Sequence, residues 1–290
     1  MSAELPSNLH LGTSSWSTTD WYEVFYPPEL HPSEFITYYA QHFDTVEIDA
    51  TFYHQPTRQT VETWARRTPE GFLFSAKVPQ VITHEKYLLD CHSEMMSFLQ
   101  TMSALGEKLG PLLLQFPYVA KKRDAHEYQT GEEFRRRLAP FLARLPTSDY
   151  RFAVEVRNAH WLNPSLVALL AERGVALALS CYYTLPSLDE IMATIDVATA
   201  DFSYVRFIGH RRRMDDLIDR LMREEGKSKR WNELVVDRRA EMERWIEGIR
   251  QLVARGLDVF VYFNNHYAGF APGSAELFKA LWLERARGSA

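Results

Sequence analysis

The stretch VEIDATFYHQPT (residues 46–57) begins with the alternation of a strand and ends in a loop. Val46 and Ile48 are apolar and β-branched, whereas Glu47 and Asp49 alternate with them. Successive side chains of a strand point to opposite faces, so the two carboxylates share one face and the two aliphatic side chains share the other. We therefore expect a strand that packs its apolar face on a helix layer and carries charge on the other face.

Short apolar segments of this kind recur along the whole chain, with helical patterns between most of them. The eight expected strands are LHLGTS (9–14), DTVEID (44–49), FLFSAK (72–77), PLLLQF (111–116), RFAVEVR (151–157), VALALS (175–180), SYVRFI (203–208) and DVFVYFN (258–264). Most are continuous hydrophobic runs, which is typical of parallel strands covered by helices. This alternation predicts an α/β fold, a closed parallel (β/α)8 barrel of the TIM type, as a single domain over residues 1–290.

An open, doubly wound sheet is the alternative fold. It is disfavoured because no glycine-rich phosphate-binding turn follows the first expected strand and no change of composition divides the chain. Residues 210–239, after the seventh strand, are dense in both charge signs. We expect this segment to be a solvent-exposed helical insertion within the barrel rather than a binding arm.

The composition narrows the classes of function. The chain has 290 residues, 46% of them hydrophobic, and a net charge of -5, which argues against a surface that is wholly a nucleic-acid footprint. Cys91 and Cys181 have no partner at metal-ligand spacing, so we expect neither a disulfide framework nor a zinc site. The amino terminus does not resemble a signal peptide, and no segment is apolar enough to span a bilayer. We expect a cytoplasmic protein with no membrane partner.

Polar residues gather at the carboxyl ends of the expected strands, where barrels carry their active sites. We predict that Glu47, Lys77, Glu155 and Arg157 are catalytic, with a carboxylate as general acid or base and the cations setting its pKa. Aromatic and hydrogen-bonding groups in the same region suit a polar, partly flat ligand. The predicted substrate-binding residues are Trp16, Tyr53, His84, Gln115, Trp161, Arg206, His210, Asn264 and Asn265.

Each of these residues also has a structural interpretation. Glu155 and Arg157 could belong to an ion-pair network with Lys77 and Glu47 across the barrel mouth, without catalysis. Asn264 and Asn265 could be turn formers. The chain contains no Walker loop, HExxH, GxSxG or paired CxxC motif, so no metal site or cofactor can be identified from the sequence.

Several motifs together resemble those of the YecE-like proteins, a family catalogued as domain of unknown function number 72. They are LGTSSW, FYPPEL, FDTVEIDATFYHQPT, GFLFSAKVPQVITH, LGPLLLQFP, FAVEVRNAHW, YVRFIGH and VFVYFNNHYAGFAPGSAELF, in family order from about residue 9 to residue 280. The resemblance implies a TIM-type barrel and a pocket formed by the strand-end residues named above, but no particular activity. The first loop and the charged 210–239 segment differ from the usual family pattern.

Three functions remain open from the sequence. The first is a hydrolase or lyase that acts on a polar substrate, anionic or sugar-like. The second is a nucleic-acid phosphodiesterase or repair barrel that contacts phosphates through the arginines at 211–213 and 227–239, and the acidic net charge disfavours it. The third is a non-catalytic barrel that binds a small ligand. The sequence does not decide the oligomeric state.

Overall fold

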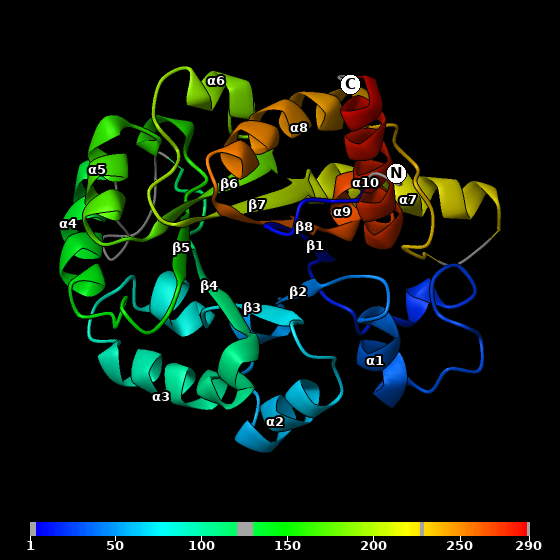
Figure 1. The fold of residues 1–290 in the computed structure, drawn as a ribbon, viewed down its shortest axis with the longest axis horizontal. Coiled ribbons are helices and arrows are strands. Elements are labelled where there is room, and N and C mark those ends of the chain that lie inside the picture. Colours follow the sequence, from blue (N-terminus) through cyan, green and yellow to red (C-terminus); the bar gives the residue numbers. More distant parts are fainter. Residues whose placement is uncertain (1–3, 121–129, 227–228, 289–290) are drawn as a thin grey trace.

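Eight parallel strands, each followed by helical structure, form the centre of the molecule (Figure 1). The computed structural model describes residues 4–120, 130–226 and 229–288. The strands are β1 (Leu9–Thr13), β2 (Thr45–Ile48), β3 (Leu73–Lys77), β4 (Leu109–Gln115), β5 (Phe152–Glu155), β6 (Ala176–Tyr182), β7 (Phe202–Gly209) and β8 (Asp258–Phe263). All eight expected strands are confirmed, with boundaries that shift by one or two residues.

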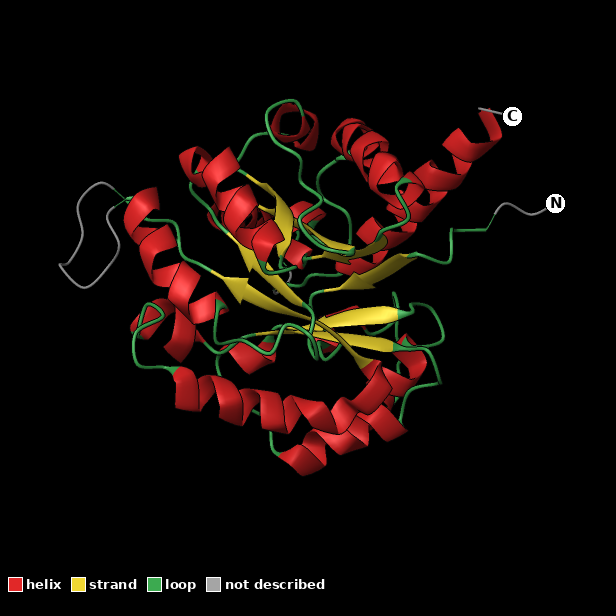
Figure 2. Cartoon of the chain, turned by 60° about the vertical axis from the view of Figure 1, so that its left-hand side comes forward, coloured by secondary structure: helices red, strands yellow, loops and turns green. Residues whose placement is uncertain are grey.

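Helices surround this sheet on its outer side (Figure 2). The α-helices are α1 (Phe35–Tyr39), α2 (Arg58–Arg66), α3 (His92–Met102), α4 (Gly131–Leu142), α5 (Pro164–Glu172), α6 (Leu188–Met192), α7 (Arg211–Glu224), α8 (Arg239–Ala254), α9 (Asn265–Ala268) and α10 (Ala271–Gly288). Short turns of other helical types are η1 (Thr19–Trp21), η2 (Pro32–Glu34), η3 (Ala50–Phe52), η4 (Val81–Glu85), η5 (Ser103–Lys108) and η6 (Ala159–Trp161). No helix of the described residues is long and apolar enough to cross a membrane.

The strand order around the sheet is β1-β8-β7-β6-β5-β4-β3-β2. From β2 to β8, strands that are consecutive in the sequence are therefore neighbours in the sheet. Each ladder is parallel, and β1 pairs with β8. An open doubly wound sheet would reverse its strand order at a switch point, so the structure excludes that alternative. The fold is the predicted TIM-type barrel, in which β1 and β2 meet at a seam.

Side chains bridge this seam in place of a backbone ladder. The hydroxyl of Tyr39 accepts a hydrogen bond from the backbone N–H of Thr13 (2.8 Å) and donates to the carbonyl of Thr45 (3.1 Å). Asp44 accepts from the N–H of Leu11 (3.0 Å). The strands approach so closely that a Cβ on Gly12 would lie 2.0 Å from the Thr45 oxygen. A glycine at this point therefore permits closure of the barrel.

The barrel interior is filled in layers. At the amino-terminal end, Phe202 and Phe260 pack together, and His10 stacks on Phe260 at 4.8 Å. In the middle layer, the buried hydroxyl of Tyr262 forms hydrogen bonds with Thr45 (2.8 Å) and Ser75 (2.7 Å). The interior becomes more polar toward the carboxyl ends of the strands, as the period-two pattern predicted.

The charged segment after β7 is a helical excursion, as expected. Its helix, α7, buries Met214, Ile218 and Met222 against Trp231 and Val235 from the segment that leads to α8. These residues form a small apolar cluster apart from the main core. The charged side chains of α7 therefore remain on its outer surface while one stripe of the helix packs inward.

We expect Tyr39→Phe to destabilise the fold, because it removes the hydroxyl that links β1 to β2 and leaves a buried N–H without its acceptor. The expected loss in the free energy of unfolding is about 1–3 kcal/mol, measured by chemical denaturation. Tyr38→Phe is the matched control, since the Tyr38 hydroxyl makes no hydrogen bond within the described residues and its ring contacts would be kept. Equal stabilities of the two variants would contradict the bridging role.

Candidate active site

A buried arginine lies between two buried glutamates at the carboxyl ends of the strands. The Arg206 guanidinium, from β7, donates to Glu47 of β2 (2.7 Å) and to Glu155 of β5 (2.5 Å). The two carboxylates are fully buried and Arg206 is 2% exposed. The hydroxyl of Tyr204 donates to the second oxygen of Glu47 (2.7 Å). These contacts join three strands that are not neighbours in the sheet.

Arg157 extends this network toward solvent. Its Nε donates to Glu155 (2.8 Å), and its guanidinium carbon lies 4.3 Å from the centre of the Tyr182 ring. Burial raises the pKa of Glu155, but the charges of Arg206 and Arg157 outweigh it and hold that pKa at about 2. Glu155 is therefore ionised at neutral pH. Both of its oxygens accept from an arginine.

A second group of polar side chains lies beside the network. The ammonium of Lys77 forms an ion pair with Asp49 (2.9 Å) and lies 4.0 Å from the centre of the Phe52 ring. The His84 ring packs edge-on against the same Phe52 ring at 4.9 Å. Burial and the charges of Lys77 and Arg157 lower the pKa of His84 to about 4, so its imidazole is neutral at neutral pH.

Three buried polar atoms at the carboxyl ends of the strands have no hydrogen-bond partner in the part of the chain that is described. They are the hydroxyl oxygens of Ser14 and Ser180 and the Nε of Arg206. Ser180 pairs in register with Arg206, so these two atoms belong to the same level of the barrel. Buried polar atoms are normally satisfied, and unsatisfied ones at one level are consistent with a site for a polar ligand.

Two tryptophans that were predicted to bind substrate are buried and belong to the hydrophobic core. Trp161 is 1% exposed and stacks on Phe134 at 4.8 Å, in the layer of α4. Trp16 is 9% exposed and packs edge-on against Trp64 and Phe74. Both indole rings are thus buried against residues of the helix layer, Trp64 of α2 and Phe134 of α4. No described contact of either ring reaches the charged network.

The other predicted binding residues are distributed around the barrel mouth. Tyr53 is exposed and contacts Phe52, while the amide of Gln115 donates to the carbonyl of Phe116. His210 caps α7 and stacks on Tyr183 at 3.9 Å. The side chains of Asn264 and Asn265 accept from the N–H groups of His266 and Ala271. Both asparagines thus stabilise local turns, which was their alternative interpretation, and each keeps an amide nitrogen.

Tyr204, Tyr182 and Phe52 contact the charged residues of the site but were not among the predicted site residues. Tyr204 was detectable, since it stands two residues before Arg206 and so shares its face of β7. Tyr182 was missed because β6 extends two residues beyond the expected strand 175–180, and Phe52 because it lies in the η3 turn after β2. Arg206 was predicted to bind substrate, but its guanidinium is enclosed by the two glutamates.

Among the described residues, no group of three histidine, cysteine, aspartate or glutamate side chains is arranged to hold a metal ion. Both cysteines are free and buried. Fold and site together define a (β/α)8-barrel protein with a buried carboxylate–guanidinium network at the carboxyl ends of the barrel strands. The chain belongs to the DUF72 family, described as proteins of unknown function, whose model matches residues 10–289. The resemblance to YecE-like proteins is thereby confirmed.

Individual relatives agree with this assignment. The UPF0759 protein YunF of Bacillus subtilis is 27% identical over 91% of this chain and 90% of its own length. The UPF0759 protein YecE of Escherichia coli is 29% identical over 52% of this chain and 48% of its own length. A crystal structure of a DUF72 protein from Thermotoga maritima, 27% identical, matches 95% of this chain and 99% of that chain with a TM-score of 0.68. A D-tagatose 3-epimerase-like protein, 12% identical, covers 97% of this chain and 100% of its own with a TM-score of 0.54, and it shares the fold alone.

Replacing Arg206 by methionine should strongly destabilise the protein, because Glu47 and Glu155 would remain buried without their counter-charge. The expected cost is about 3–5 kcal/mol in the free energy of unfolding. Arg255→Met is the control, since two guanidinium nitrogens of Arg255 also donate to a carboxylate, but this pair is exposed to solvent. Its expected cost is below about 1 kcal/mol. Similar losses in urea denaturation would refute the central role of the buried cluster.

The Glu155 carboxyl should also make stability depend on pH. Its pKa falls from an ordinary 4.5 to about 2 on folding, so its contribution is full above pH 4.5 and is lost as the pH falls toward 2. The stability difference between wild type and Glu155→Gln should therefore narrow by about 2 kcal/mol from pH 6 to pH 3. Urea denaturation at several pH values measures it, and a difference independent of pH would contradict the depressed pKa.

Proposed function

We propose that this protein is an enzyme that acts on a small polar, anionic substrate by proton-transfer chemistry of the hydrolase or lyase type. The observation that carries the proposal is the meeting of Lys77, His84 and Arg157 at one edge of the barrel. Phe52 contacts both Lys77 and His84, and both cations act on the imidazole. A neutral imidazole near two cations is suited to proton transfer, and the two cations attract an anion to the same place.

The roles differ between the carboxylates and the other groups. Glu155 is ionised at neutral pH and its oxygens are occupied by Arg157 and Arg206, so we assign it the positioning of Arg157 rather than proton donation. Glu47 is enclosed by Arg206 and Tyr204 and holds the arginine from the other side. Proton transfer then falls to His84 with Lys77 as its cationic neighbour.

Arg157 is the best candidate for anion binding. Its side chain is 18% exposed, in contrast to the 2% of Arg206, and Glu155 and Tyr182 fix its plane. A guanidinium held in this way offers planar donors to a carboxylate or phosphate at little cost in side-chain entropy. The unpartnered hydroxyls of Ser14 and Ser180 supply further hydrogen-bonding capacity on the same side.

The His84 imidazole should titrate far below an ordinary histidine. Its ring proton signals, followed by NMR and assigned by comparison with His84→Gln, should shift with a midpoint near pH 4. The exposed His54 in the same spectrum is an internal reference for assignment. A midpoint near the ordinary 6.5 would show that burial and the charges of Lys77 and Arg157 do not lower the pKa of His84.

Activity can be tested on a panel of p-nitrophenyl phosphate, sugar phosphates and uncharged p-nitrophenyl glycosides. We expect turnover of a phosphorylated member, a loss in kcat of about 10²–10⁴ for His84→Gln and a rise in KM of about tenfold for Arg157→Gln. His54→Gln is the matched control and should stay within about twofold of wild type. Unchanged turnover in His84→Gln would refute the assignment, and binding without turnover in wild type would identify a non-catalytic binding barrel.

A further inference from the structure

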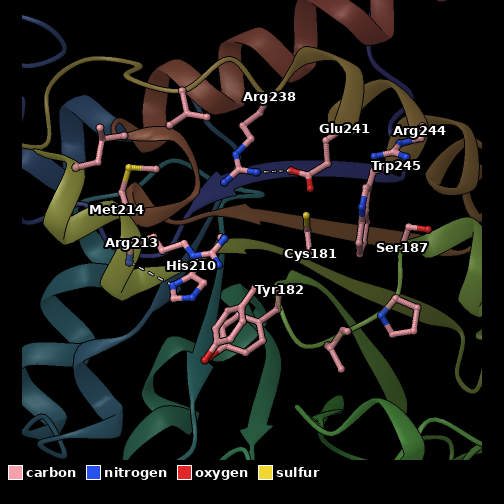
Figure 3. A pocket seen from close by; sticks show the side chains of 16 residues that line it. Cys181, Tyr182, Ser187, His210, Arg213, Met214, Arg238, Glu241, Arg244 and Trp245 are labelled. Atoms are coloured by element: carbon pink, nitrogen blue, oxygen red, sulfur yellow. Dashed lines mark hydrogen bonds and ion pairs between the residues drawn. The ribbon is translucent and has the colours of Figure 1, made fainter.

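A second pocket lies outside the barrel interior, between the carboxyl ends of β6 and β7 and the helices α7 and α8 (Figure 3). Its volume is about 300 Å³, which is at the lower end of the range for small-molecule sites. Cys181 and Tyr182 contribute from β6, Gly209 and His210 from the end of β7, and Trp245 from α8. This pocket is separate from the buried Glu47–Arg206–Glu155 cluster, none of whose members lines it.

Positive charges outnumber negative charges on the wall of this pocket. Arg213, Arg238 and Arg244 face a single carboxylate, that of Glu241. Arg238 is paired with Glu241 at 3.4 Å and also donates to the carbonyl of Tyr267 (3.1 Å). Within the described residues, the guanidinium groups of Arg213 and Arg244 make no hydrogen bond or ion pair. The pocket therefore has two cations more than its own carboxylate balances.

The rest of the wall is aromatic and apolar. His210 stacks on Tyr183 at 3.9 Å, and Tyr183 in turn packs against Tyr182 at 4.5 Å. In Figure 3, the Arg213 side chain extends over His210, while Arg244 and Trp245 lie together on the opposite side. A ligand in this space would meet flat ring surfaces and guanidinium groups at the same time.

The thiol of Cys181 points into this region but is not an activated nucleophile. Burial and the neighbouring Glu241 raise the pKa of the thiol well above its ordinary value. The thiol is therefore protonated at neutral pH and contributes a small apolar contact. The pocket has the features of a binding site rather than of a second reaction centre.

We propose that this pocket binds a small organic anion with a flat apolar body. Arg213 holds its carboxylate or phosphate group beside the Tyr183–His210 stack, and the flat body extends toward Arg244 and the ring of Trp245 on the opposite side. The proposal does not depend on the activity assigned to His84 and Arg157. It also gives His210, predicted from the sequence as a substrate-binding residue, a place in this second pocket.

The probe for the test is phenyl phosphate, with inorganic phosphate and benzyl alcohol as its two halves. Calorimetric titration of the full chain should show phenyl phosphate binding at least about tenfold more tightly than either half. Only the intact probe can contact the guanidinium groups and the aromatic rings of the pocket at the same time. Met214 lines the pocket and is buried. Its methyl NMR signal, assigned with Met214→Leu, should shift during the titration and so locate the binding.

The double variant Arg213→Gln/Arg244→Gln should weaken this binding by about tenfold or more and abolish the Met214 shift. Both arginines are exposed, so the fold should be kept. Arg212→Gln/Arg220→Gln is the matched control, since it removes the same charge from exposed positions of α7 outside the pocket. Equal weakening in both double variants, binding of inorganic phosphate as tight as that of phenyl phosphate, or no Met214 shift would each overturn the proposal. A loss confined to Arg157→Gln would instead assign the probe to the barrel mouth.

Discussion

The contact of Arg206 with Glu47 and Glu155 is the constraint on which the carboxyl-terminal end of the barrel depends. Each of these three groups would be costly to bury alone, and each is tolerable only because the other two are present. Since they come from β7, β2 and β5, the interaction ties together strands that share no backbone ladder. It fixes the shape of the barrel mouth in a way that nonspecific apolar packing would not.

The layers beneath this cluster are arranged to support it. Tyr204 fills the barrel centre with its ring and gives its hydroxyl to Glu47, while Tyr262 binds Thr45 and Ser75 one level below. Polar groups inside the barrel are thus satisfied mainly by one another, which is required in an environment of low dielectric constant. The same saturation leaves the oxygens of both glutamates occupied by donors within the cluster.

Much of the fold was predictable from the sequence because it depends on local signals. Apolar runs such as 111–116 and the alternation at 151–157 gave the strands, and period two gave the inward placement of Glu47 and Glu155. The identity of the partners was not predictable in this way. Arg206 meets both glutamates across the barrel, and that depends on the strand positions in the closed sheet rather than on sequence spacing.

Loop residues were the least predictable part of the site. Trp16 and Trp161 follow strands, as binding residues do, yet both indole rings are buried against the helix layer. Apolar burial of a large ring is favourable enough to decide the course of a loop, and no pattern in the sequence separates this outcome from an exposed binding ring. The pocket beside α8 was hidden for a related reason, since its walls come from residues about 60 positions apart, such as Cys181 and Glu241.

The end of β6 connects the two proposed sites. Ser180 has its side chain at the level of Arg206 inside the barrel, and the next residue, Cys181, faces the outer pocket, as alternation in a strand requires. Tyr182 belongs to both sites, since its ring lines the outer pocket and lies under the Arg157 guanidinium. Arg157 is in turn held by Glu155, which Arg206 fixes. A ligand in the outer pocket would therefore contact the same aromatic ring on which the Arg157 guanidinium rests.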